Sequence, residues 1–445
     1  MSNTVVAPVY EISKRRGQNG DNKLSPEDRP AHDWYRFVLS FPPHLVRDYL
    51  SRFAVRESQL VLDPFCGTGT TLVECKKFGI PSIGFEANPM AAFASSVKLD
   101  WSVDPDGLMD HAAGIASEAS LGLRKLGLLD DSTSLFQLSE HYENVLRTLP
   151  EEQQNLLLTN SISPLPLHKA LVLLDTIKKR HDDRYQKHES LAFAKIIVYS
   201  ASNLNFGPEV GLGVIKRDAP VIDPWLFAVE AMANDLRSLR SLSKTRAIVY
   251  GNDAREMTLK AKGGIVDAVI TSPPYPNEKD YTRTTRLESV LLGFISTKRE
   301  LQDLKRRLVR SNTRNVYKGD DDDLWVASFP EIQRIADAIE KRRIELGKTS
   351  GFERLYAKVT KLYFGGMARH LSDLRPVLRP GARLAYVVGD QASYLRVMIR
   401  TGKILADIAQ SFGYELVGID LFRTRLATAT KEQLREEVVL LRWPG

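Results

Sequence analysis

Apolar positions along the chain form two kinds of pattern. Short apolar runs have the length of buried strands, and most are followed by a stretch whose apolar positions recur three and four residues apart, as in an amphipathic helix. The runs predict strands at residues 59–62, 81–85, 247–249, 266–271, 382–388, 415–422 and 436–442. Strands that alternate with helices predict an α/β fold with a doubly wound, mostly parallel sheet.

The pattern changes between residues 101 and 245, where helical periodicity dominates. Candidate helices lie at residues 106–126, 134–147, 167–180, 188–203 and 223–242. In the last of these, Asp223 is expected to cap the helix and Pro224 to occupy its first turn. We therefore expect a large helical insertion, residues 101–245, whose glycine-rich loop at residues 203–213 either connects helices or folds over a site.

Composition narrows the class of protein. Residues 1–30 are polar and lack the apolar core of a signal peptide, which predicts a flexible leader. No long uncharged apolar run is present, so no membrane span is expected. The two cysteines, Cys66 and Cys75, exclude a disulfide scaffold and favour a reducing, cytoplasmic location. No Cys/His cluster has zinc-ligand spacing, so no metal is expected.

The first predicted strand leads into Asp-Pro-Phe-Cys-Gly-Thr-Gly-Thr, residues 63–70. Gly67 and Gly69 permit a tight turn and a close approach of the backbone to a ligand, and the helix that follows offers unpaired N–H groups. The spacing matches neither a Walker loop nor the dinucleotide fingerprint. Taken alone, such a loop is more often an ordinary strand–turn–helix.

Two carboxylates change that interpretation. Glu86 ends the next strand, where an acidic side chain can accept hydrogen bonds from ribose hydroxyls. Asp253 follows the short strand at residues 247–249, so it is expected at the same edge of the sheet. Together with the glycine turn, they predict a site for a nucleotide-like cofactor.

A second corner between a strand and a loop is formed by Ser272-Pro273-Pro274-Tyr275. Loops at the carboxyl ends of parallel strands gather at one edge of a sheet, so this corner is expected to face the glycine turn. The prolines fix φ and remove N–H donors, which leaves a rigid loop that presents hydrogen-bond acceptors. A plain Pro-Pro turn with an incidental aromatic residue is the alternative.

These segments resemble the S-adenosylmethionine-dependent DNA methyltransferases that act on exocyclic amino groups. The resemblance covers about residues 32–100 and 246–443, and Ser-Pro-Pro-Tyr is its most specific part. It implies a Rossmann-like methyltransferase fold with an antiparallel closing strand, a catalytic domain made of residues 31–100 and 246–445, and S-adenosylmethionine as the cofactor. It also implies that the aromatic-rich segment at residues 32–53 lines the methionine end of the pocket, unless that segment only packs in the core.

The same resemblance implies roles for individual residues. Glu86 corresponds to the residue that binds the ribose, and Asp253 to the residue that binds the adenine amino group. The implied cofactor-binding residues are Asp63, Pro64, Phe65, Cys66, Gly67, Thr68, Gly69, Thr70, Glu86, Ala87, Asn88, Asp253 and Ala254. The implied catalytic residues are Ser272, Pro273, Pro274 and Tyr275.

An exocyclic amino group is a weak nucleophile, because its lone pair is delocalised into the base. The Ser-Pro-Pro-Tyr corner is expected to overcome this weakness. Ser272 Oγ and the Pro273 carbonyl are expected to accept the amino N–H groups, and Tyr275 offers a face on which an extruded base stacks. Positioning then suffices, without a covalent enzyme intermediate. In the resembling family a Ser at the start of the motif favours cytosine N4, and Asp or Asn favours adenine N6. Cytosine N4 is therefore preferred, and adenine N6 stays open.

Basic residues gather in residues 297–318, which hold eight Lys or Arg and two acidic residues. Such clusters neutralise phosphates without reading sequence, so residues 296–370 are the candidate DNA-recognition region. The predicted DNA contacts are Arg283, Arg286, Arg310, Arg314 and Lys318. A solvated helix face is the alternative for this stretch, and the helical insertion is the rival recognition domain. The cofactor loop precedes the catalytic motif here, unlike in many Ser-Pro-Pro-Tyr enzymes. The order of segments therefore does not decide whether the basic stretch or the helical insertion recognises DNA.

The sequence thus predicts a site-specific DNA (cytosine-N4)-methyltransferase that acts on double-stranded DNA. It is expected to be the modification half of a restriction or phage-defence system, with a cognate restriction endonuclease or a defence complex as partner. Two alternatives stay open: an RNA amino-methyltransferase on the same scaffold, and a non-catalytic DNA-binding subunit. The intact Ser272, Glu86 and Asp253 argue against the second of these.

Overall fold

The computed structural model describes residues 24–36, 40–131, 146–207, 209–257, 263–276, 280–426 and 433–445. The expected helix at residues 134–147 lies almost wholly outside these residues, as does the expected leader up to residue 23. The described end of that leader forms a 3-10 turn, Pro26–Asp28, and Asp28 is buried beside Arg47, with 2.6 Å between Arg47 Nη1 and Asp28 Oδ1.

The described strands are β1 (Val61–Asp63), β2 (Ser82–Phe85), β3 (Leu204–Phe206), β4 (Val210–Leu212), β5 (Ala247–Tyr250), β6 (Val266–Thr271), β7 (Leu378–Gly389), β8 (Glu415–Leu426) and β9 (Gln433–Arg442). The described helices are α1 (Arg29–His32), α2 (Pro43–Arg52), α3 (Thr70–Lys77), α4 (Pro89–Lys98), α5 (Pro105–Lys125), α6 (Glu151–Leu156), α7 (Pro164–Lys179), α8 (Gln186–Ile196), α9 (Ile222–Leu239), α10 (Tyr281–Thr284), α11 (Arg286–Leu291), α12 (Lys298–Arg306), α13 (Pro330–Glu345), α14 (Tyr356–Leu374) and α15 (Thr401–Ser411).

Seven of these strands form a sheet in the order β5-β2-β1-β6-β7-β9-β8. The first five are parallel, and β9 runs antiparallel to both of its neighbours. This arrangement confirms the predicted α/β fold, a Rossmann-like methyltransferase sheet with an antiparallel closing strand.

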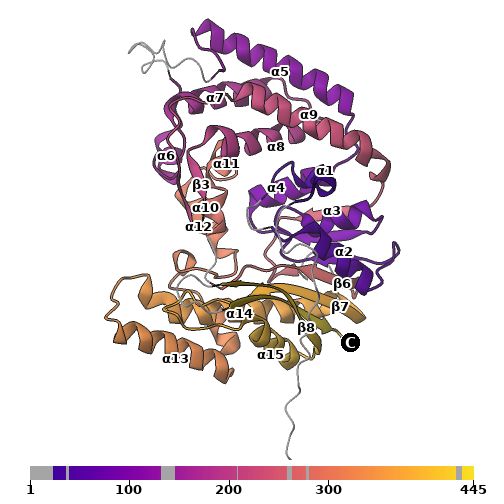
Figure 1. The fold of residues 1–445 in the computed structure, drawn as a ribbon, viewed down its shortest axis with the longest axis vertical. Coiled ribbons are helices and arrows are strands. Elements are labelled where there is room, and N and C mark those ends of the chain that lie inside the picture. Colours follow the sequence, from indigo (N-terminus) through magenta and orange to yellow (C-terminus); the bar gives the residue numbers. More distant parts are fainter. Residues whose placement is uncertain are drawn as a thin grey trace, which may run out of the picture.

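Side chains that alternate along each strand divide the sheet into two apolar faces. Val61 and Ala268 point to one face and pack with side chains of α2 and α3. Leu62 and Val269, one position further along, point to the other face and pack with α13, α14 and α15. Figure 1 shows these three helices below the sheet and α2 and α3 above it. Both faces are covered, as a parallel sheet requires.

Helices α5, α7, α8 and α9 form a further layer over this sheet (Figure 1). Their apolar side chains, Trp225 of α9 among them, belong to one hydrophobic cluster that also contains Leu72 and Val73 of α3. The helical layer is therefore packed against α3, one of the helices that cover the sheet.

The start of α9 corrects a prediction. The helix begins at Ile222 and the side chain of Asp223 makes no capping hydrogen bond. Instead, the carboxylate of Asp130 accepts the backbone N–H groups of Val221 (2.9 Å), Ile222 (2.7 Å) and Asp223 (3.1 Å). A carboxylate more than ninety positions earlier thus takes the role that local spacing assigned to Asp223.

Two shorter segments complete the description. The predicted helix at residues 188–203 ends as an α-helix at Ile196 and continues as a π turn over Ile197–Ala201. The glycine-rich loop forms the hairpin of β3 and β4. None of the described helices is both long and apolar enough to cross a membrane.

Candidate active site

The two motif corners lie side by side because their strands are neighbours. β1 and β6 pair in parallel, with Val61 beside Ala268 and Leu62 beside Val269, so both chains leave the sheet at the same edge. Thr271 Oγ1 donates to Asp63 Oδ1 at 2.6 Å and ties the two strand ends together.

The loops that follow β1 and β6 line the same cavity, together with the ends of β2 and β5. About 1480 Å³ of empty space lies within it, its open mouth included. Predicted residues that line the cavity are Pro64, Phe65, Cys66, Gly67, Thr68, Thr70, Glu86, Ala87, Asn88, Asp253, Ala254, Ser272, Pro273, Pro274 and Tyr275.

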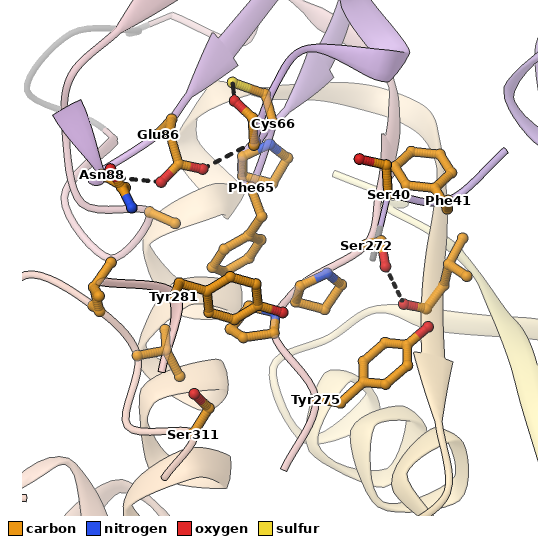
Figure 2. Close-up of a pocket in the computed structure, with 18 of the residues that line it drawn as sticks. Ser40, Phe41, Phe65, Cys66, Glu86, Asn88, Ser272, Tyr275, Tyr281 and Ser311 are labelled. Atoms are coloured by element: carbon orange, nitrogen blue, oxygen red, sulfur yellow. Dashed lines mark hydrogen bonds between the residues drawn. The ribbon is translucent and has the colours of Figure 1, made fainter. Parts of the chain in front are cut away.

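Figure 2 shows how the labelled side chains are distributed. Glu86 and Asn88 lie at one end of the cavity, and Ser272 and Tyr275 lie at the other. Phe65 lies between the two ends. The cavity therefore has a carboxylate end and a Ser-Pro-Pro-Tyr end.

Two of the predicted cofactor contacts do not line the cavity. Asp63 is fully buried below it, where burial raises the pKa of its carboxyl to about 6 although Thr271 and the Phe65 N–H donate to it. Gly69 has φ +88°, a conformation that favours glycine, and a Cβ there would lie 2.5 Å from Ser95 Oγ. Both residues support the glycine turn from behind, and their direct contact with a cofactor stays a prediction.

Gly67 faces the cavity and also has a left-handed backbone, with φ +51°. Its N–H donates to Glu86 Oε2 at 2.9 Å, and the Asn88 N–H donates to Glu86 Oε1 at 2.8 Å (Figure 2). Each carboxylate oxygen thus keeps lone-pair capacity for a ligand. Burial outweighs these two hydrogen bonds and raises the pKa of Glu86 to about 7.

Asp253 is fixed by Arg255 rather than left to move. Arg255 donates to the Asp253 carboxylate from Nε at 3.0 Å and from Nη2 at 2.6 Å. The same guanidinium also reaches the buried carboxylate of Asp322 and, at 3.0 Å, the carbonyl of Arg306. Arg255 therefore joins the end of β5 to the segment after α12, which forms another wall of the cavity.

At the other end, Ser272 Oγ donates to the carbonyl of Val387 in β7 at 3.2 Å (Figure 2). A hydroxyl has one proton and two lone pairs, so this contact leaves the oxygen to act as an acceptor toward the cavity. The ring of Tyr275 packs on Gly389, the last residue of β7, where a Cβ would lie 2.7 Å from its Cε2 atom. Gly389 was not identified from the sequence, since it is a glycine at the end of a distant strand.

Gly389→Ala is expected to turn the Tyr275 ring and to lower the rate of the reaction by up to about 100-fold, the cost of misplacing a reacting group by about 1 Å. Gly389 has no positive φ, so the added methyl group acts only through the ring. The matched control is Gly418→Ala in β8, where a Cβ meets nothing within 4 Å. Equal turnover for the two variants would show that the position of Tyr275 is unimportant.

Two of the five predicted DNA contacts have donors that are engaged inside the protein. Arg310 is 3% exposed, and its guanidinium holds Asp320 by two hydrogen bonds of 2.8 and 2.7 Å. Arg286 donates to the Thr282 carbonyl at 3.0 Å and to the Leu156 carbonyl at 3.2 Å. Both arginines stabilise the fold around the cavity, because their donors are engaged inside the protein.

The other three predicted DNA contacts lie nearer to solvent. Arg314 and Lys318 are exposed, and Arg283 is half-buried. Arg314 Nη1 lies 3.8 Å from Glu209 Oε2, next to the β3–β4 hairpin. The candidate recognition region extended to residue 370, but α14, at its end, is packed in the core below the sheet. Exposed basic side chains of residues 297–318 are what remains of it.

Several cavity residues were not assigned to it from the sequence. They are Ser40, Phe41, Tyr281, Arg307, Leu308, Val309, Ser311, Asn315, Val387, Phe422, Arg423, Arg425 and Glu436. Ser40 and Phe41 belong to the aromatic-rich segment before α2, which the family resemblance placed near the pocket. The segment from Arg307 to Asn315 carries a signal, its positive charge, but that signal indicates a DNA surface rather than a cavity wall. In the described residues no group of three His, Cys, Asp or Glu side chains is arranged to hold a metal ion.

Comparisons with known proteins show similarity to methyltransferases. A family model described as a DNA methylase of the N6/N4 type matches residues 5–94. The type II methyltransferase M.BsoBI of Geobacillus stearothermophilus is 25% identical over 450 residues, which cover 94% of this chain and 85% of that protein. The type II methyltransferase M.AvaI of Nostoc sp. is 23% identical over 462 residues, which cover 94% and 87%.

Among solved structures, TrmN from Thermus thermophilus matches with 11% identity and a TM-score of 0.29, over 90% of this chain and 48% of TrmN. The fold is identified from this chain's own strand order. Residues 5–94 thus match a DNA methylase family model of the N6/N4 type, and most of the chain is similar to two type II methyltransferases. These similarities support the amino-methyltransferase family, and the family in turn implies S-adenosylmethionine as the methyl donor.

Proposed function

We propose that this chain is a site-specific DNA methyltransferase that transfers a methyl group from S-adenosylmethionine to the exocyclic amino group of an extruded base, with cytosine N4 as the preferred target. The observation that carries the proposal is the shared cavity, which has Glu86 at one end and Ser272 at the other. The match of residues 5–94 to a DNA methylase family model supports DNA as the substrate, in keeping with the two type II methyltransferases to which the chain is similar.

The carboxylate end fits a nucleoside-containing cofactor. Glu86 is the acceptor for ribose hydroxyls, because each of its oxygens is oriented by one backbone N–H and retains lone-pair capacity. The turn at Gly67 has no side chain and opens into α3, whose first N–H groups have no partner within the helix. When bound, S-adenosylmethionine supplies an electrophilic methyl group on a positively charged sulfur.

The Ser-Pro-Pro-Tyr end holds the acceptor amino group. Ser272 Oγ accepts one amino N–H, because its own proton is donated to Val387. The Pro273 carbonyl is the second acceptor, on a loop whose φ angles the prolines restrict. The ring of Tyr275, backed by Gly389, is the platform on which the extruded base stacks. These groups hold the nitrogen lone pair toward the carboxylate end.

The preference for cytosine N4 rests on Ser272 at the start of the motif, where the family resemblance links Ser to cytosine and Asp or Asn to adenine. Arg283, Arg314 and Lys318 are the proposed contacts to the phosphates around the target, since their side chains reach solvent near the cavity wall. A cognate restriction endonuclease is the proposed biological partner, in keeping with the type II relatives.

The proposal is tested by incubating the purified chain with S-adenosylmethionine labelled in its methyl group and with unmodified bacterial DNA or RNA. Label is expected in DNA. Label in RNA alone would show that the chain is an RNA methyltransferase. No label in either polymer would support a non-catalytic binding subunit.

A further inference from the structure

The β8–β9 hairpin extends past the end of the sheet at the edge where the cavity opens. The last residue of β7, Gly389, pairs with Glu436 of β9. Beyond that point β8 and β9 continue to pair with each other, as Thr424 with Arg435, Arg425 with Leu434 and Leu426 with Gln433. Three further residue pairs carry the hairpin about 10 Å beyond β7.

The overhanging hairpin contributes to the cavity, because Phe422, Arg423, Arg425 and Glu436 all line it. It is also directly connected to the Ser-Pro-Pro-Tyr end. Tyr275 packs on Gly389, Gly389 pairs with Glu436, and Glu436 pairs with Arg423. With adjacent strands about 4.8 Å apart, these arginines lie two strands away from the ring on which the base is proposed to stack.

The charges on this hairpin are arranged asymmetrically. Arg423 binds Glu436 through two hydrogen bonds, Nε to Oε2 at 2.6 Å and Nη2 to Oε1 at 2.9 Å. Arg425 Nε lies 3.9 Å from the same carboxylate, which is too far for a hydrogen bond, and its side chain is 45% exposed. One carboxylate therefore serves two guanidinium groups, and within the described chain Arg425 has no hydrogen-bond partner.

The charged side chains around the hairpin also leave an excess of positive charge. Four arginines surround three carboxylates in the contacts among Arg400, Arg423, Arg425, Arg435, Asp390, Glu436 and Glu437. Asp390 is contacted by Arg400 at 2.5 Å and by Arg435 at 3.1 Å. After these pairs are counted, one positive charge remains, and Arg425 is the side chain that carries it toward the cavity mouth.

We propose that Arg425, with Arg423 held in place by Glu436, binds the phosphate backbone of the DNA strand that carries the target base. This inference rests on the proposed function. A base that stacks on Tyr275 remains joined to its strand through one sugar, so its flanking phosphates lie at the cavity mouth. A guanidinium group matches a phosphate with paired N–H donors, and Glu436 fixes the orientation of Arg423 before DNA arrives.

The test compares Arg425→Ala with Arg442→Ala. Arg442 belongs to the same hairpin and is exposed to a similar degree, 49%, but it lies at the opposite end of β9, where it pairs with Glu415 at 2.9 Å. Methyl transfer to unmodified bacterial DNA is measured at several NaCl concentrations, and binding of a fluorescent 30-base-pair duplex is measured in parallel. Thermal unfolding verifies that all variants are folded, and calorimetric titration with S-adenosylmethionine verifies the cofactor site.

Arg425→Ala is expected to raise KM for DNA about tenfold and to lower the slope of log affinity against log salt by about 0.9, the value for one lost phosphate contact. Arg425→Lys is expected to restore the slope, because the charge is kept. Arg442→Ala is expected to stay within twofold of the natural chain in both measurements.

Equal KM values and equal salt slopes for Arg425→Ala and Arg442→Ala would overturn the inference. The arginines would then have only a structural role in the β8–β9 hairpin. A natural chain that binds cofactor but labels no DNA would instead contradict the proposed function. The duplex-binding slopes of the variants then still decide whether the hairpin contacts phosphate.

Discussion

Ser272→Ala is expected to lower the rate of methyl transfer by about 100- to 1,000-fold while the affinity for S-adenosylmethionine stays within threefold. The hydroxyl oxygen is directed at the cavity because its proton is donated to the Val387 carbonyl. Alanine removes the acceptor that orients the amino group, and the loss of one such positioned hydrogen-bonding group lowers kcat by about 100- to 1,000-fold. Single-turnover transfer of labelled methyl to DNA measures the rate, and calorimetric titration measures cofactor binding.

A matched control for this variant is Ser96→Ala on α4. Ser96 also donates its hydroxyl to a backbone carbonyl, that of Phe93, at 2.8 Å, but it lies outside the cavity. Its removal is expected to leave transfer unchanged. Full activity of Ser272→Ala would remove Ser272 from the chemistry, and a parallel loss of cofactor affinity would show that the substitution acts through the fold of the cavity.

The second large effect is a pH-dependent affinity for S-adenosylmethionine that depends on Glu86. Burial raises the pKa of this carboxyl to about 7 in the free protein, whereas the ionised form is the better acceptor for ribose hydroxyls. Binding therefore favours the carboxylate and must remove a proton below pH 7. Affinity is expected to rise as pH increases from 5.5 to 8, by nearly tenfold per unit on the acidic side of the pKa.

The variant Glu86→Gln distinguishes the titration of the Glu86 carboxyl from that of other ionisable groups nearby. The amide retains an acceptor oxygen but cannot ionise, so the pH dependence is expected to flatten and the affinity at pH 8 to fall by about 10- to 100-fold. Asp63, whose pKa is raised to about 6, titrates in both proteins and does not line the cavity. A pH profile of Glu86→Gln as steep as that of the natural chain would contradict the role of Glu86.

The parts of the site that could be predicted from the sequence are those whose signal is local. A short apolar run, a glycine turn and a Pro-Pro corner each restrict the backbone within a few residues, so the sequence alone places the ends of β1 and β6 at one sheet edge. Parallel pairing then requires Gly67 and Ser272 to face the same space, and they line the same cavity.

The parts that could not be predicted depend on contacts between distant segments. Asp130 caps α9 in place of Asp223, because a carboxylate from another loop reaches the same N–H groups. Arg310 lies in a basic stretch that predicts a surface cation, but the return of the chain at Asp320 buries it. The sequence pattern near Gly389 gives no sign that its missing side chain makes room for Tyr275.

The segment between α12 and α13 illustrates the same limit for function. Its positive charge is plain from the sequence, yet charge alone does not distinguish a DNA surface from a wall of the cofactor cavity. The contacts of Arg255 with Asp253, Asp322 and the Arg306 carbonyl attach this segment to the end of β5. Its apolar side chains, Leu308 and Val309, consequently face the cavity, and its exposed cations face solvent.

The central claim is that the glycine turn and the Ser-Pro-Pro-Tyr corner hold a methyl donor and an exocyclic amino group in the same cavity. Mass analysis of nucleosides from the DNA of a methylation-deficient bacterium that produces this chain tests it most directly. N4-methylcytosine is the predicted product, and its amount should fall strongly when the bacterium produces Ser272→Ala. N6-methyladenine would keep the chemistry and reverse the choice of base, whereas DNA without any methylated exocyclic amino group would contradict the claim.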